Sequence, residues 1–306
     1  MNVLDTLWTE KYRPHTLEDL VISEANRKFF ESIEDTIPHL LFVGTPGLGK
    51  TTLARIIIEH ILECQYLYIN ASDENGIDTI RSKVVGFART KSLDGKIKVV
   101  VLDEADGITI DGQRALRNTM EEYAGTTRFI LTANYKHKII PAIQSRSQFF
   151  DLTPAFDDVV KRIVTIAKAE GVSVAGEQRE NLVAVIKEGY PDIRKIINNV
   201  QKYTLGGSFN VEVALQSAGV IAEIHKHVVG KDALKLRKYL IEHESEFQGD
   251  YHNILKQYLE YVYTSDLTDM KKRQFIVTIS EHMYKDSFVM DKEINAFACW
   301  ISLETI

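Results

Sequence analysis

Residues 44–51 read Gly44-Thr45-Pro46-Gly47-Leu48-Gly49-Lys50-Thr51, and this stretch decides the fold. Apolar residues 40–43 precede it, and a helix-like stretch, residues 53–62, follows it. In that context the pattern G-x-x-x-x-G-K-[ST] is a P-loop. Its glycines let backbone N–H groups face phosphates at the positive end of a helix, Lys50 reaches the outer phosphates, and Thr51 holds Mg²⁺. The stretch predicts ATP-like triphosphate binding with Mg²⁺; the alternative is an ordinary glycine-rich turn.

The composition is that of a globular protein with room for two or three domains, at 306 residues and 44% hydrophobic content. Two cysteines, Cys64 and Cys299, provide no disulfide framework, which fits a reducing compartment. No signal peptide and no membrane-crossing run is visible, so we expect a soluble, cytoplasmic protein without a membrane partner. A net charge of −6 argues against broad coating of nucleic acid but leaves room for a local basic patch.

The chain changes character near residue 153. Before it, β-rich runs alternate with helical stretches, which predicts a mostly parallel α/β sheet with ligands at the carboxyl ends of its strands. After it, apolar residues recur at helical spacing and no strand is predicted between residues 157 and 222. We therefore expect an α/β core (1–153), a small helical domain (154–222) and an all-helical C-terminal domain (223–306). The predicted strands are residues 40–43, 66–70, 98–102, 129–132 and 149–152.

Two adjacent carboxylates, Asp103 and Glu104, end the apolar run 98–102. Asp103 fits the carboxylate that binds Mg²⁺ beside a P-loop. Glu104 is placed to polarise the attacking water as a general base, which favours hydrolysis over a nucleotide switch. The alternative is an acidic loop after a buried strand.

Three further polar residues fit a hydrolytic site. Asn134 can bond the attacking water or the γ-phosphate if its strand lies between the P-loop strand and the Asp103 strand; otherwise it is a turn residue. Arg146 can supply a cation to a γ-phosphate, an effect worth on the order of a thousandfold or more. Arg194 lies in the helical domain and reaches the phosphates only when that domain closes. From spacing alone, a solvated surface charge explains each arginine as well as a catalytic role does.

Several motifs now occur in an order that resembles one family. Residues 8–14 read Trp-Thr-Glu-Lys-Tyr-Arg-Pro, residues 70–78 read Asn-Ala-Ser-Asp-Glu-Asn-Gly-Ile-Asp, and residues 103–106 read Asp-Glu-Ala-Asp. With residues 132–134 and the Ser-Arg pair before Ser147, they resemble the AAA+ sliding-clamp-loader ATPases, of the replication factor C small-subunit and phage large-subunit type. The family motif has cysteine at the position of Ser147, and the arginine before it is kept.

The resemblance implies roles for individual residues. Catalytic roles fall to Glu104, to Lys50, to Asn134 as first sensor and to Arg146 as a finger acting on a neighbouring subunit. Arg194 is the second sensor, and Thr51 and Asp103 hold Mg²⁺. The adenine, ribose and phosphate contacts come from Thr9, Glu10, Lys11, Tyr12, Val21, Gly47, Leu48, Gly49, Lys50, Thr51 and Thr52.

The resemblance also implies partners: primer–template DNA, a ring-shaped sliding clamp, and other subunits. Arg81 and Lys83 lie off a predicted buried stripe, where family members follow DNA phosphates; a solvated helix face is the alternative. Gln113 resembles the residue that couples DNA contact to the ATP site. One chain carries both the cis elements and Arg146, so we expect copies to build sites head-to-tail, together with one divergent subunit.

The leading hypothesis is an ATPase that opens a clamp and places it on primer–template DNA, with hydrolysis releasing the clamp. One alternative is another AAA+ motor, such as a branch-migration helicase or a protein remodeller. Another is an assembly subunit that binds ATP without turnover. The phage-like arrangement implies viral DNA replication in a bacterial host cytoplasm.

Overall fold

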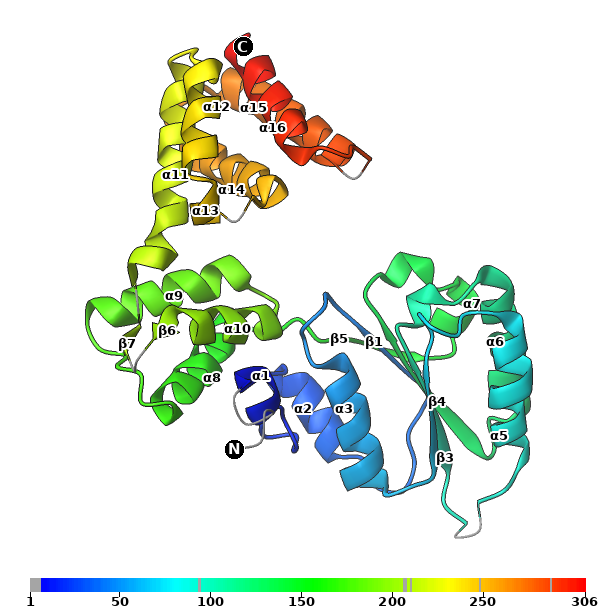
Figure 1. Cartoon of the computed structure of the whole chain (residues 1–306). Coiled ribbons are helices and arrows are strands. Elements are labelled where there is room, and N and C mark those ends of the chain that lie inside the picture. Colours follow the sequence, from blue (N-terminus) through cyan, green and yellow to red (C-terminus); the bar gives the residue numbers. More distant parts are fainter. Residues whose placement is uncertain (1–6, 93–94, 206–207, 210, 248, 287) are drawn as a thin grey trace. The chain divides into compact units, whose positions relative to one another are not determined.

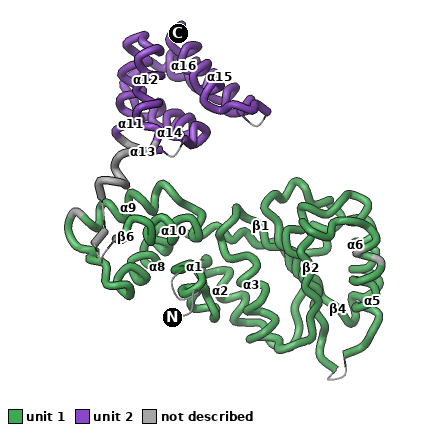
Figure 2. Tube along the Cα trace, viewed as in Figure 1, with its two compact units in different colours: residues 1–209 green, residues 210–306 purple. Residues whose placement is uncertain are grey.

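The computed structural model describes residues 7–92, 95–205, 208–209, 211–247, 249–286 and 288–306. The chain forms two compact units, residues 1–209 and 210–306 (Figure 2). The predicted three-domain division stays a prediction. Its core and residues 154–209 of its first helical domain fall in one unit, whereas residues 210–222 fall in the other, and its boundary at 222/223 lies within the helix α11 (Val211–Val229).

A five-stranded parallel sheet forms the centre of the first unit, in the order β2-β3-β4-β1-β5 (Figure 1). The strands lie within two residues of the predicted positions: β3 is extended by one residue, β4 begins two residues earlier and ends one later, and β5 begins and ends one residue earlier. Every residue of β1 and β3 is buried, as expected where helices cover both faces of a parallel sheet. The strands are β1 (Leu40–Val43), β2 (Tyr66–Asn70), β3 (Lys98–Asp103), β4 (Thr127–Ala133) and β5 (Gln148–Asp151).

The two faces of the sheet pack against different helices because side chains alternate along each strand. Leu40 and Phe42 join a core with α2 (Glu24–Glu31) and α3 (Lys50–Ile56). Leu41 and Val43 join a second core that includes the helix α6 (Ile110–Glu122). Figure 1 shows α2 and α3 on one side of the sheet and α5, α6 and α7 on the other. The sheet is therefore held from both sides, with its strand ends free to carry polar groups.

Short helical segments complete the sheet-bearing part of the first unit. These are α1 (Trp8–Lys11), the π-helical η2 (Ile57–Leu62), α4 (Ile77–Thr79), the π-helical η3 (Ile80–Val84), α5 (Val85–Arg89), the 3₁₀ segments η4 (Ala105–Gly107) and η5 (Lys136–Lys138), and α7 (Pro141–Gln144).

Three helices follow the sheet in the first unit and make the lid: α8 (Phe156–Ala169), α9 (Glu177–Gly189) and α10 (Ile193–Tyr203). Asp192 caps α10 by accepting a hydrogen bond from the Lys195 N–H at 2.9 Å. A two-residue antiparallel pair, β6 (Thr204–Leu205) and β7 (Ser208–Phe209), follows α10. The prediction of no strand here was wrong for these residues, because a two-residue ladder leaves no alternation pattern to read.

The second unit is helical, as predicted, around a core that contains the buried Tyr258 and Trp300. Its helices are α11, α12 (Ala233–Glu242), α13 (Glu244–Phe247), α14 (Tyr251–Thr264), α15 (Asp269–Asp286) and α16 (Lys292–Glu304). Among the described residues, no helix is both long and apolar enough to cross a membrane.

Candidate functional site: a P-loop ATPase centre

The P-loop connects β1 to α3 with backbone angles that glycine permits. Gly47 and Gly49 have φ of 78° and 82°, in the left-handed region where a Cβ is costly. Gly49 is the N-cap of α3, so the loop delivers the first N–H groups of that helix to the carboxyl end of the sheet. The sequence pattern thus produces an anion-binding helix N-terminus at this edge.

Lys50 is buried at the base of the loop, at 8% exposure. Its ammonium donates to Gly44 O at 2.7 Å, Thr45 O at 2.9 Å and Asn134 Oδ1 at 2.8 Å, which uses all three of its protons. Burial lowers the pKa of Lys50, and the nearby Asp103 carboxylate acts in the opposite direction. The lysine is therefore fixed at the loop, where a phosphate would favour its charged form.

Asp103, at the end of β3, is contacted by three hydroxyl groups. Thr51 Oγ1 lies 2.9 and 3.0 Å from its two carboxylate oxygens. Thr132 Oγ1 donates to Oδ1 at 2.6 Å, and the Tyr68 hydroxyl donates to Oδ2 at 2.7 Å. Burial and this bond to Asp103 raise the pKa of Tyr68 to about 12, so it stays a donor at neutral pH.

The residues around Asp103 fit a Mg²⁺ ion. One carboxylate and one hydroxyl, from Asp103 and Thr51, meet beside the phosphate-binding loop. No group of three or more His, Cys, Asp or Glu side chains that could hold a metal ion is found in the part of the chain that the structure describes. A carboxylate and a hydroxyl beside a phosphate-binding loop would suit Mg²⁺, which takes few protein oxygens and relies on phosphate and water for the rest.

Glu104 follows Asp103 in a left-handed conformation, with φ of 55°, which is uncommon for a residue with a side chain. Its N–H donates to Thr132 Oγ1 at 2.9 Å, and its carboxylate accepts a hydrogen bond from Ser72 Oγ. The turn places an exposed carboxylate next to the metal-binding one, as a general base requires.

Asn134 follows β4, and β4 lies between β1 and β3 in the sheet. The strand before Asn134 therefore lies between the P-loop strand and the Asp103 strand, as a role at the γ-phosphate requires. Its side-chain oxygen accepts from Lys50, and its N–H donates to Asp106 Oδ1 at 3.2 Å. The sheet order thus brings Lys50, Asp103, Glu104 and Asn134 together at one edge.

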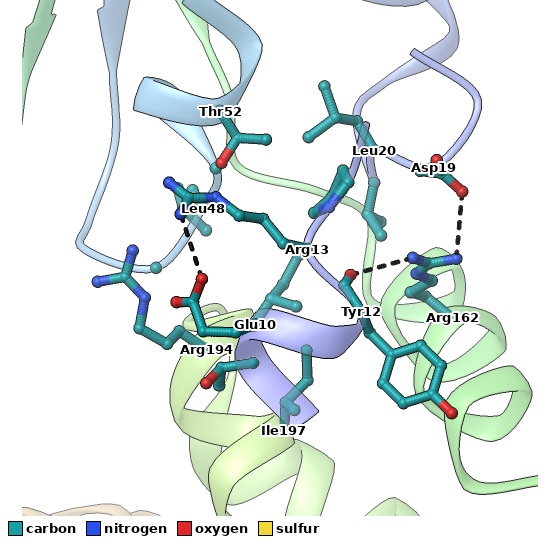
Figure 3. A pocket seen from close by; sticks show the side chains of 16 residues that line it. Glu10, Tyr12, Arg13, Asp19, Leu20, Leu48, Thr52, Arg162, Arg194 and Ile197 are labelled. Atoms are coloured by element: carbon teal, nitrogen blue, oxygen red, sulfur yellow. Dashed lines mark hydrogen bonds and ion pairs between the residues drawn. The ribbon is translucent and has the colours of Figure 1, made fainter. Parts of the chain in front are cut away.

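A pocket of about 640 Å³, including its part open to solvent, lies beside the P-loop (Figure 3). Eight of its lining residues, besides Arg194, were predicted from the sequence: Thr9, Glu10, Tyr12, Val21, Gly47, Leu48, Gly49 and Thr52. In Figure 3, Arg13 extends from the N-terminal segment toward Leu48, and Arg194 extends from the lid toward the P-loop. The pocket is thus built by three segments far apart in sequence.

The lid contacts both the P-loop and the N-terminal segment. A Cβ added to Gly47 would overlap the carboxylate of Asp192, so this glycine permits the approach of α10. Lys11 Nζ and the Tyr12 hydroxyl each donate to Glu170 Oε1 at 2.6 Å. The Lys11 ammonium therefore points to the lid. Among the described residues it is not part of the pocket lining, unlike the other predicted members of the N-terminal segment.

The two predicted arginines have different positions. Arg194, the second residue of α10, lines the pocket of its own chain. Arg146 follows α7 and is not among the described residues that line this pocket. Its guanidinium donates to Ala142 O at 2.7 Å and pairs with Glu121 of α6.

The predicted DNA-binding residues lie on the segment η3. The Lys83 ammonium is 2.6 Å from Glu74 Oε2 in an exposed ion pair. The side chain of Arg81 lies outside the described residues. Gln113 is buried at the start of α6; it donates to Ile108 O and Lys138 O and accepts from Ile140 N at 2.8 Å.

Sequence reasoning missed several residues of the site. Tyr68, Ser72 and Thr132 act through Asp103 and Glu104, and a hydroxyl within or beside a strand carries no signal of its own. Arg162 of α8 lines the pocket and lies 3.7 Å from Asp19, which also lines it. Arg13 belongs to the motif at residues 8–14 and pairs with Glu10 at 3.3 Å, but the predicted nucleotide contacts stopped at Tyr12, one residue before it.

The comparisons with known proteins agree with this geometry. The family described as "ATPase family associated with various cellular activities (AAA)" matches residues 40–154. A second, the "Sliding-clamp-loader large subunit, AAA+ ATPase lid domain", matches residues 152–213. The replication factor C small subunit of Sulfolobus acidocaldarius is 44% identical over 226 residues, covering 71% of this chain and 68% of the relative. That of Aeropyrum pernix is 35% identical, covering 99% of this chain and 97% of the relative.

The chain belongs to the replication factor C small-subunit family. It is an AAA+ ATPase of the clamp-loader type, and the resemblance predicted from its motifs is confirmed. Among solved structures, a variant of Thermotoga maritima RuvB matches with a TM-score of 0.53 at 18% identity, over 80% of this chain and 91% of that one. This similarity shows the AAA+ fold alone.

Proposed function

We propose that this family member is the ATPase subunit of a loader that opens a ring-shaped clamp and places it on primer–template DNA. The observation that carries the proposal is the clamp-loader lid, residues 152–213, whose helix α10 supplies Arg194 to the pocket beside the P-loop. Closure of that lid on ATP is the step that can favour the clamp-open state. Hydrolysis then removes the γ-phosphate contact and releases the clamp.

Each residue has a distinct part in the proposed reaction. The P-loop N–H groups and Lys50 bind the phosphates, and Thr51 and Asp103 would hold Mg²⁺, which would supply charge neutralisation to the phosphates. Glu104 takes the proton of the attacking water, and Asn134 orients that water or the γ-phosphate. The pocket formed with the N-terminal segment receives the adenine and ribose.

The test of the proposed function is the ATPase rate with primed DNA, with a candidate clamp, and with both. Joint stimulation well above either partner alone is expected, because clamp and DNA together select the closed, hydrolysing state. Stimulation by branched DNA, with no response to any clamp, would instead support the alternative AAA+ motor. No turnover under any condition would support the assembly subunit that binds ATP without hydrolysis.

We further propose that Arg146 acts on the ATP of a neighbouring copy of this chain. Its position outside the pocket of its own chain supports this, because a finger in trans must lie on another face. A head-to-tail contact of this kind gives a ring or an open spiral. We propose that one divergent subunit joins this assembly and that Arg81 and Lys83 face the DNA. The loader is proposed to serve viral replication in a bacterial host.

Mixing two inactive variants tests the trans arrangement. Arg146→Ala is expected to lower turnover about a thousandfold or more while each chain still binds nucleotide. Mixed with a Lys50→Ala chain, which keeps Arg146, part of the activity should return. No recovery at any mixing ratio would mean that Arg146 does not act across copies.

A further inference from the structure

Tyr68 lies on β2 next to the strand that carries the metal-binding carboxylate. Asn70 of β2 pairs with Asp103 of β3, so Tyr68 projects from the same face of β2 two residues earlier. Its hydroxyl donates to Asp103 Oδ2 at 2.7 Å, while the side chain is 37% exposed. The phenol therefore reaches diagonally across the strand pair to a single carboxylate oxygen, Asp103 Oδ2.

The strand on the other side of β3 supplies the matching contact. Thr132 of β4 is fully buried and donates to the opposite oxygen, Asp103 Oδ1, at 2.6 Å. Since β3 lies between β2 and β4, each neighbouring strand fixes one carboxylate oxygen. Two donors on opposite oxygens set the rotation of the carboxylate about its last bond, which one donor alone cannot do.

The Tyr68 ring is itself held from the P-loop helix. The guanidinium of Arg55 lies 5.6 Å from the centroid of the ring, within the range of a cation–π contact. Arg55 is four residues after Thr51 on α3, so the two side chains share one face of that helix. The helix that offers the Thr51 hydroxyl to the metal therefore also orients the tyrosine that holds Asp103.

We propose that Tyr68 is a positioning residue for the Mg²⁺ site, holding the Asp103 carboxylate from β2 while Thr132 holds it from β4. The inference rests on the proposed roles of Asp103 and Thr51. A donor on a metal-ligating carboxylate orients it, and loss of such a donor typically weakens metal binding or activity by about 10–100-fold. Removal of the phenolic hydroxyl alone should thus weaken metal binding about tenfold.

The chain offers a matched control on the same strand. Tyr66 is also exposed, at 45%, and its hydroxyl lies 3.3 Å from the carboxylate of Glu59, away from Asp103. Tyr66→Phe removes the same atom from the same face of β2 without touching the metal site.

The experiment measures Mn²⁺ binding to the ADP-saturated protein by the Mn²⁺ EPR signal, for wild type, Tyr68→Phe and Tyr66→Phe. Affinity for a fluorescent ADP in EDTA is measured in parallel. We expect Tyr68→Phe to raise the half-saturating Mn²⁺ concentration about tenfold, with unchanged ADP affinity in EDTA and wild-type behaviour of Tyr66→Phe.

Three outcomes would overturn the inference: equal Mn²⁺ binding in wild type and Tyr68→Phe, equal weakening in both variants, or tighter binding in Tyr68→Phe. A wild-type protein that binds ADP but no Mn²⁺ would instead refute the proposed metal site itself. The failure of the inference and that of the proposed function are thus distinguishable.

Discussion

The two ends of the nucleotide site are built from different kinds of contact. At the phosphate end, Lys50 and Asp103 are each 8% exposed and bonded to neutral partners. At the lid end, the Lys11–Glu170 and Arg13–Glu10 pairs join charged side chains, of which Glu170 is 18% exposed and the other three are 36–44% exposed. Chemistry that depends on orientation lies at the first end, and contacts that can open and close lie at the second.

The difference follows from what each contact costs to break. A buried polar group that loses its partner pays its desolvation, whereas an exposed ion pair exchanges its partner for water at little cost. The phosphate end should therefore respond to the loss of a single atom, and the lid end should respond weakly and according to salt. Substitutions that change only one or two atoms can test this contrast.

The largest expected effect is at Glu104. Glu104→Gln keeps the shape of the side chain and its contact with Ser72 but removes the base, so turnover should fall by about 10²–10⁴-fold while ATP binding stays intact. Single-turnover hydrolysis and equilibrium ATP binding measure the two quantities. Asp111→Asn, which removes an exposed carboxylate from α6, is the control and should leave both unchanged. Normal turnover in Glu104→Gln would remove Glu104 as the base.

An intermediate effect is expected at Thr132. Thr132→Val removes the donor to Asp103 and the acceptor of the Glu104 N–H, which should cost about 1–3 kcal/mol of unfolding free energy. Turnover should fall by about 10–100-fold, because both carboxylates lose their orientation. Urea unfolding and steady-state ATPase measure the two effects.

Thr127→Val is the matched control for Thr132→Val. Thr127 is equally buried on the same strand, yet its hydroxyl has no hydrogen-bond partner among the described residues. Its replacement by valine should be neutral or stabilising, because no bond is lost and a polar atom leaves the core. If both variants lost the same stability and activity, the hydroxyl contacts of Thr132 would not be what stabilises and orients the phosphate end.

Much of this arrangement could be predicted from the sequence. The P-loop, the strand positions and the pairing of Asp103 with Thr51 follow from local patterns that carry their own chemistry. The motif around Trp8 predicted Thr9, Glu10 and Tyr12 of the pocket lining. Lys11 turns instead to Glu170, 159 residues away, and no local pattern records such a partner. Tyr68 and Thr132 could not be found, because their role depends on which strands flank β3. That order is set by packing, not by the strand sequences.

The smallest expected effect is at the lid end. Glu170→Gln removes the charge that pairs with Lys11 but keeps an acceptor for Lys11 and Tyr12. ATP affinity should fall by less than about fivefold at low salt, and the loss should fade as salt screens the exposed pair. Nucleotide binding measured at 0.05 and 0.5 M NaCl tests this, because ions screen exposed charges far more at the higher concentration. Asp158→Asn on α8 is the lid control, because within the described part of the chain its ion pair is with Lys161. A loss of ATP affinity as large as the roughly 10–100-fold loss of turnover expected for Thr132→Val, and equal at both salt concentrations, would mean that the lid is held as rigidly as the phosphate end.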